Sequence, residues 1–130
     1  DGKDIINSKI KHREWCRPFG ASVKQDKASD YFDIDNSPYM MYTSQVIQKG
    51  LDSIIHIDGT CRHQTVTPEQ NETFYRLLDA FEEKTGLSVL LNTSLNLGGK
   101  PIAGTIAEAI EVYQTTEMDA LCLGNHLLLK

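Results

Sequence analysis

The feature that most constrains the fold is a change in hydrophobic period at Thr67. Before it, residues 54–57 and 60–66 are rich in β-branched side chains and flank Asp58-Gly59, a pair suited to the positive φ angles of a tight hairpin turn. After it, apolar side chains recur at the spacing of one α-helical face: Phe74, Leu77, Leu78 and Phe81. A hairpin followed by an amphipathic helix predicts an α+β fold, with a largely antiparallel sheet and packed helices.

The remaining elements follow from local signals along the chain. Asn71 and Gly86 are the expected N-cap and C-terminal glycine of this helix, and Thr105 with Glu108 forms a capping box for a second helix. Gly124-Asn125, between two apolar runs, predicts a terminal hairpin. We also expect a short helix over residues 4–10, strands over 13–17, 39–47 and 87–91, and an acidic surface loop over 24–35.

Composition limits the class of protein. The 130 residues, 40% hydrophobic and 24% charged, suit one soluble domain. The net charge of −5 disfavours nonspecific binding to nucleic acid or to an anionic membrane. No apolar run has the roughly 18–20 residues of a membrane span, and the polar first residues lack the apolar core of a secretory signal, so we expect a cytoplasmic protein. Because the chain begins at Asp1 rather than Met, we expect it to be part of a longer protein.

The three cysteines do not form a recognisable set. Cys16, Cys61 and Cys122 stand singly, without the spacing of a disulfide framework or of a zinc site, so we expect buried thiols and no metal site. A nucleophilic cysteine would need a base beside it, and the sequence specifies none.

Three cations recur at alternate positions near the amino end. If residues 13–17 form a strand, then Lys11, Arg13 and Arg17 project from one face. Like charges on one face repel unless an anion lies between them, so this arrangement favours a polyanionic ligand such as a phosphate chain. A solvated cationic edge strand that discourages aggregation explains the same pattern equally well.

Two further candidates supply another arginine and a group of neutral donors. Arg62, on the predicted strand 60–66, either completes an anion site or only covers the surface of the sheet. The predicted strand 87–91 is followed directly by hydroxyl and amide side chains: Asn92, Thr93, Ser94 and Asn96. Such groups can donate to a bound oxyanion, although a simple polar turn is the alternative. Converging cations and neutral donors suit phosphoryl or nucleotidyl transfer.

Five sequence blocks, in order, cover nearly the whole chain. They read KIKHREWCRPFGASV, SPYMMYTSQV, HIDGTCRHQTV, FYRLLDAFEEKTGLSVLLNTSLNLGGKPI and DALCLGNHLLLK. Together they resemble the C-terminal domain of the NodU/CmcH family of O-carbamoyltransferases. The resemblance implies one domain over residues 1–130 with a YrdC-like fold, an α/β twisted open sheet related to the threonylcarbamoyl-AMP synthases. It also implies an actin-like N-terminal domain, outside this chain, that holds the metal of the family.

The resemblance assigns roles to residues already singled out by charge. In such domains a K-x-R motif and an S-x-N motif hold the nucleotide and the carbamoyl group, and here they are Lys11-His12-Arg13 and Ser94-Leu95-Asn96. ATP and carbamoyl phosphate would react to give carbamoyl-adenylate. The residues expected to act in this reaction are Lys11, Arg13, Arg17, Arg62 and Ser94. Those expected to bind the substrates are the same five together with Asn92, Thr93 and Asn96.

The resemblance also predicts the partners. Mg²⁺ is expected to shield the pyrophosphate leaving group, and the actin-like domain to pass the carbamoyl group to an acceptor hydroxyl. The alternative is a non-catalytic nucleotide- or RNA-binding module, although the net charge of −5 and the lack of aromatic platforms argue against RNA. A chain that folds but is inert without its partner domain is a third possibility.

Overall fold

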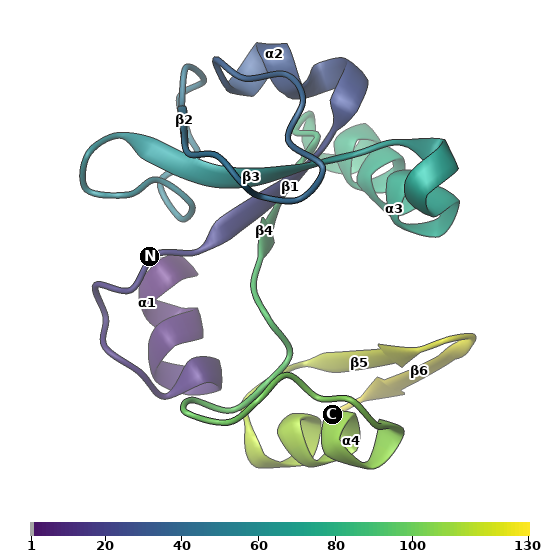
Figure 1. Ribbon diagram of the computed structural model, residues 1–130. Helices are drawn as coiled ribbons and strands as arrows, with labels where there is room; N and C mark the ends of the chain where they lie inside the picture. Colours follow the sequence, from purple (N-terminus) through teal and green to yellow (C-terminus); the bar gives the residue numbers. More distant parts are fainter. Residues whose placement is uncertain (1) are drawn as a thin grey trace. The chain divides into compact units, whose positions relative to one another are not determined.

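The computed structural model describes residues 2–130 (Figure 1). The chain divides into two compact units: unit 1 comprises residues 2–17 and 94–130, and unit 2 comprises residues 18–93. Unit 2 contains a four-stranded sheet and unit 1 a two-stranded sheet, and each unit also contains helices. The combination confirms the predicted α+β class.

The sheet of unit 2 has the strand order β2-β3-β1-β4. Its strands are β1 (Gly20–Lys24), β2 (Ser44–Gln45), β3 (Thr60–Val66) and β4 (Val89–Asn92). β1 pairs in parallel with β3, whereas the β1–β4 and β2–β3 pairings are antiparallel. All five residues of β1 are buried, as expected of an inner strand covered on both faces.

The long helix α3 (Pro68–Thr85) contacts β1, β3 and β4. It begins one turn earlier than predicted, because Thr67 and Gln70 form a capping box there. The helix is kinked at Asn71, whose carboxamide oxygen accepts a hydrogen bond from the Phe74 N–H at 3.0 Å. Asn71 therefore caps the second segment of the helix, as its sequence position predicts.

The segment predicted as an acidic surface loop is instead part of the core of unit 2. It contains the end of β1, the 3₁₀-helix η2 (Gln25–Lys27) and the short helix α2 (Ala28–Tyr31). Tyr31 and Phe32 are buried, and the Tyr31 hydroxyl accepts a hydrogen bond from the Ser88 N–H. The prediction was wrong because the aromatic residues, rather than the carboxylates beside them, decide where the segment packs.

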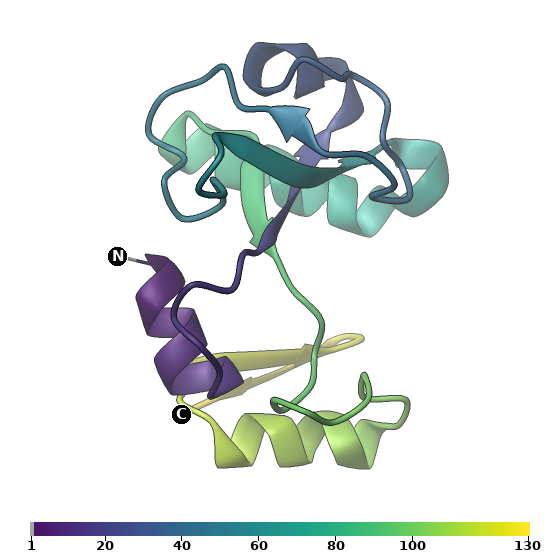
Figure 2. The same cartoon turned by 60° about the vertical axis from the view of Figure 1, so that its left-hand side comes forward.

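Unit 1 combines N-terminal and C-terminal elements. Its N-terminal part is the helix α1 (Gly2–Ile5) with the π-helix η1 (Ile6–Lys11), which confirms the short helix predicted there. Its C-terminal part is α4 (Ile106–Thr115), with the predicted Thr105–Glu108 capping box, and the hairpin of β5 (Ala120–Leu123) and β6 (His126–Leu129). Figure 2 shows α4 running along this hairpin.

Two predicted strands are much shorter or absent. Of residues 39–47 only β2 is a strand, because Met40 takes a left-handed φ of 55° and interrupts the extended run. No strand forms over residues 54–57, and the antiparallel partner of β3 is β2. The turn at Asp58-Gly59 does form, with Gly59 at a φ of 82° and the Asp58 carboxylate accepting from the Thr60 N–H. Ile54 contributes to the core instead of to a strand.

No helix within residues 2–130 is both long enough and apolar enough to span a membrane.

Candidate anion-binding site

A buried lysine organises the candidate site in unit 1. Lys11, the last residue of η1, is 2% exposed. Its ammonium donates to the main-chain oxygens of Ser94 and Asn96 at 2.7 and 3.0 Å, and lies 2.5 Å from Asn96 Oδ1 and 3.4 Å from Ser94 Oγ. The structure therefore brings the two predicted motifs, K-x-R and S-x-N, into direct contact.

The segment that accepts hydrogen bonds from Lys11, residues 94–100, is held together by hydrogen bonds of its own. The Ser94 hydroxyl donates to Asn96 Oδ1 at 2.5 Å, and Asn96 Nδ2 donates to the Lys100 carbonyl at 2.6 Å. Gly98 lies so close to Lys11 that an added Cβ would come within 2.6 Å of the Lys11 carbonyl oxygen. Only glycine leaves room for this approach. The Lys100 ammonium pairs with Glu111 at 3.2 Å.

Residues 13–17 form a turn and not the predicted strand. His12 takes a left-handed φ of 46°, which reverses the chain directly after η1, and the Arg17 N–H donates to the Glu14 carbonyl. The argument from alternating strand faces was therefore wrong, and Trp15 in this turn is 75% exposed.

The side chain of Asn7 holds this turn in place. It is fully buried, and its amide nitrogen donates to the carbonyls of Trp15 and Arg17, each at 3.1 Å. These bonds occupy carbonyls that a strand would need for its ladder. The sequence analysis did not single out Asn7; the available signal is a polar residue one helical turn before Lys11 in an otherwise ordinary short helix.

The positive charges of Lys11, Arg13 and Arg17 repel one another. Burial lowers the pKa of the Lys11 ammonium, and repulsion from Arg13 and Arg17 lowers it further. Burial and repulsion from Arg17 likewise lower the pKa of the Arg13 guanidinium. Within residues 2–130, no carboxylate lies within ion-pair distance of Lys11, and the Arg17–Glu14 pair is long, at 4.0 Å, and exposed. Lys11, Arg13 and Arg17 thus form a cluster of cations whose mutual repulsion a bound anion would relieve.

The other predicted ligands belong to unit 2. Arg62 is exposed on β3, and Thr93 is exposed directly after β4. Asn92 is occupied within the sheet, where its amide donates to Ser22 Oγ at 2.9 Å and to Gln64 Oε1 at 3.3 Å. The substrate contacts expected of these three residues stay predictions.

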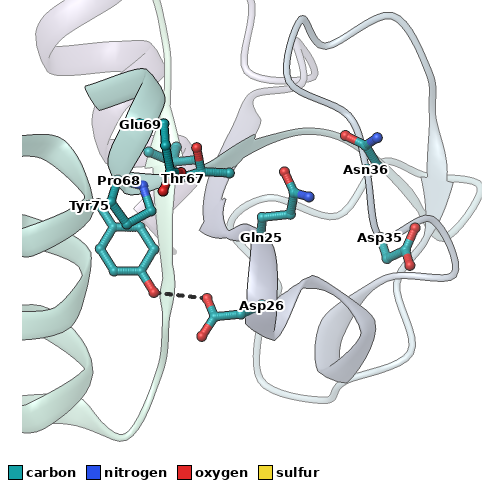
Figure 3. Close-up of a pocket in the computed structure, with 9 residues that line it drawn as sticks. Gln25, Asp26, Asp35, Asn36, Thr67, Pro68, Glu69 and Tyr75 are labelled. Carbon is teal, nitrogen blue, oxygen red and sulfur yellow. Dashed lines mark hydrogen bonds between the residues drawn. The ribbon is translucent and has the colours of Figure 1, made fainter. Parts of the chain in front are cut away.

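Unit 2 also contains a hollow of about 570 Å³ that no prediction included (Figure 3). Tyr75 on α3 donates its hydroxyl hydrogen to Asp26 at 3.0 Å, the bond drawn as a dashed line in Figure 3. The lining also includes Asp35 and Glu69. Three carboxylates repel phosphate, so this hollow does not compete with the cluster in unit 1 as an anion site.

The buried Cys61 and His63 offer no alternative chemistry. Cys61 is buried, as predicted, and burial raises its pKa to about 12, so it is not a thiolate at neutral pH. Cys16 and Cys122 are exposed, contrary to the prediction of buried thiols. His63 is structural: it is fully buried, stacked 4.2 Å from Phe32, with Nδ1 bonded to Ser44 Oγ. In the described part of the chain, no group of three or more His, Cys, Asp or Glu side chains is placed to hold a metal ion.

Comparison with known proteins identifies the class to which this fold and site belong. The family model described as "Carbamoyltransferase C-terminus" matches residues 1–130, and the chain therefore belongs to this family.

Individual relatives agree with this assignment. The chain is 36% identical to "Nodulation protein NolNO" of Sinorhizobium fredii over 98% of its own length and 20% of the relative's. It is 37% identical to "Nodulation protein NolO" of Bradyrhizobium diazoefficiens, over 100% and 25% of the two lengths. It is 31% identical to the "3'-hydroxymethylcephem-O-carbamoyltransferase" of Streptomyces clavuligerus, over 95% and 24%. The chain thus spans about a quarter or less of these curated relatives.

Proposed function

We propose that this chain binds ATP and carbamoyl phosphate and forms carbamoyl-adenylate, whose carbamoyl group is then transferred to an acceptor hydroxyl. The observation that carries the proposal is the buried Lys11 ammonium, which no carboxylate of residues 2–130 neutralises and which lies against the Ser94–Asn96 segment. Two polyanionic substrates need such a site, because their phosphates must be held close together despite mutual repulsion.

Each of the proposed site residues in unit 1 then has its own role in binding the substrates. Arg13 and Arg17 bind phosphate oxygens through charge-assisted hydrogen bonds. Lys11 keeps Ser94 and Asn96 in place and adds its charge to the site. Ser94 and Asn96 orient the carbamoyl and α-phosphate oxygens. Arg62, Asn92 and Thr93 are further ligands expected from the family resemblance.

The overall chemistry is set by mass balance. Carbamoyl phosphate, ATP and one water give carbamoyl-adenylate, one phosphate and one pyrophosphate. Mg²⁺ would arrive on the phosphates of ATP, as part of the substrate. An actin-like N-terminal domain of the same protein is the proposed partner for the second step. The printed name of the Streptomyces relative specifies O-carbamoyl transfer, which supports a hydroxyl acceptor.

Pyrophosphate release by the full-length protein tests the proposal. We expect release only when ATP, Mg²⁺ and carbamoyl phosphate are all present, and we expect Ser94→Ala to reduce the rate at least tenfold. Arg76→Ala, which removes an exposed arginine of α3, is the matched control and should leave the rate unchanged. ATP binding without pyrophosphate release would instead favour a non-catalytic nucleotide-binding module, and salt-sensitive RNA binding an RNA-binding one.

A further inference from the structure

Asn7 connects directly to one of the proposed phosphate ligands. Its carboxamide oxygen accepts a hydrogen bond from Arg13 Nε at 2.7 Å. Its main-chain carbonyl accepts from the N–H groups of His12 and Arg13. Since its amide nitrogen already holds the carbonyls of Trp15 and Arg17, the side chain uses its single acceptor and both donors. One buried residue thus fixes both the path of the turn and the plane of the Arg13 guanidinium.

This arrangement matters because an arginine side chain has many rotamers. Ordering such a side chain when a ligand binds costs conformational entropy, and that cost is subtracted from the affinity. A hydrogen bond at Nε orders the guanidinium before the ligand arrives. It also satisfies one donor of a cation that is held close to Lys11 and Arg17 despite their repulsion.

We infer that Asn7 is a positioning residue of the proposed nucleotide site, which holds Arg13 in the orientation that binds the phosphates of ATP. The inference rests on the function proposed above. It assigns Asn7 no contact with substrate, so its effect must pass through Arg13.

Asparagine suits this task better than the residues nearest to it in size. Aspartate would accept from Arg13 but would neutralise its charge and repel the carbonyls of Trp15 and Arg17. Leucine is similar in size but would give up the hydrogen bonds to the Trp15 and Arg17 carbonyls and to Arg13 Nε. Glutamine is longer by one methylene, and a fully buried side chain has little room for the addition.

A double-mutant cycle on ATP binding tests the inference in the full-length protein. Calorimetry should give a dissociation constant raised at least tenfold by Arg13→Ala and about tenfold by Asn7→Ala. The double variant should bind no more weakly than Arg13→Ala alone, because Asn7 has nothing to position once Arg13 is gone. Leu51→Ala, a buried change in the apolar core of unit 2, controls for general destabilisation and should leave the dissociation constant unchanged.

Each other outcome has a definite meaning. If the losses from the two single variants multiply in the double variant, Asn7 acts independently of Arg13 and the inference is overturned while the proposed function stands. If the wild-type protein does not bind ATP, both are overturned. Should Asn7→Ala fail to fold, Asn7→Ser takes its place, because it leaves Arg13 intact and keeps a hydroxyl at this position, but its shorter side chain does not reproduce the bond to Arg13 Nε. A loss of at least tenfold is then expected, and binding within twofold of wild type would contradict the inference.

Discussion

Lys11 in unit 1 and Lys24 in unit 2 are both buried lysines, but the charges around them differ in sign. The Lys24 ammonium lies 2.6 Å from Asp79 and 2.5 Å from Glu82 on α3, so two carboxylates neutralise it. Although burial opposes the charge, these partners raise the pKa of Lys24 above its ordinary value. Lys11 has only neutral oxygens as partners within the described chain, and its pKa is lowered.

The difference separates a lysine that stabilises the fold from one that prepares a site. A buried cation with carboxylate partners has no need of a further anion, whereas a buried cation among neutral oxygens and other cations does. The two units also differ in whether apolar or polar contacts hold them together. The apolar cluster of unit 2 includes residues of its sheet and of α2, such as Val23, Val89 and Tyr31. The organising contacts of the turn in unit 1 are polar and centre on Asn7 and Lys11.

Replacing Lys11 should have the largest effect on stability. Lys11→Met removes charge-assisted hydrogen bonds to the Ser94–Asn96 segment, each worth roughly 1.5–3 kcal/mol, while relief of the buried charge offsets part of the loss. We expect the free energy of unfolding to fall by about 3 kcal/mol and ATP binding to be lost, as measured by denaturant titration and calorimetry. Unchanged ATP affinity in a folded Lys11→Met protein would contradict the role assigned to this lysine.

Replacing Lys24 should affect stability alone. Lys24→Met leaves Asp79 and Glu82 without their partner, but both carboxylates retain some contact with water, so the loss should be about 2 kcal/mol rather than the roughly 3–5 kcal/mol of a fully buried pair. Denaturant titration checks the stability, and calorimetry should give the wild-type affinity for ATP. A weakened ATP affinity here would remove the distinction between the two lysines.

A smaller effect is expected from pH at His63. Burial lowers the pKa of this imidazole below its ordinary value of 6.5, so the unfolded chain binds a proton more readily than the folded chain. Above about pH 6.5 the imidazole is neutral in both states, and the folded protein has its full stability. Below that pH the unfolded chain binds the proton first, so the free energy of unfolding falls as the pH approaches the pKa of the folded state. We expect the free energy of unfolding to fall by up to about 1 kcal/mol between pH 7 and 5.5 on this account.

The variant His63→Gln isolates this contribution. It removes the titrating group at the same place in β3, and the other titrating residues affect both proteins alike. Denaturant titrations at several pH values should therefore give a shallower pH dependence for the variant. Equal slopes for the two proteins would show that His63 does not titrate as its burial predicts.

The sequence predicted the elements whose signals are local. The Thr105–Glu108 capping box, the helical face around Leu78 and the hairpin at Gly124-Asn125 each depend on residues a few positions apart, and each forms. The predicted strands over residues 13–17 and 54–57 do not form. Over residues 13–17 the Asn7 side chain bonds to main-chain carbonyls, and no propensity scale includes that competition.

The candidate site was predicted in part, and for a partly wrong reason. Lys11, Ser94 and Asn96 do meet, although 83 to 85 positions separate them in the chain. Charge and family resemblance pointed to them, but the strand predicted over residues 13–17 does not form. The neutral partners of Lys11 could not be predicted, because a sequence does not specify which oxygens a buried ammonium will meet. The difference between Lys11, with neutral partners, and Lys24, with carboxylate partners, could therefore be seen only in the structure.

The most direct test is the affinity of the full-length protein for ATP, measured by calorimetry on the wild type, on Arg13→Ala and on the surface control Arg76→Ala. If the positively charged turn binds phosphate, Arg13→Ala should weaken binding at least tenfold, which is about 1.4 kcal/mol or more, with Arg76→Ala unchanged. Equal affinities in all three proteins, or no binding in any, would contradict the assignment of the turn as the phosphate site.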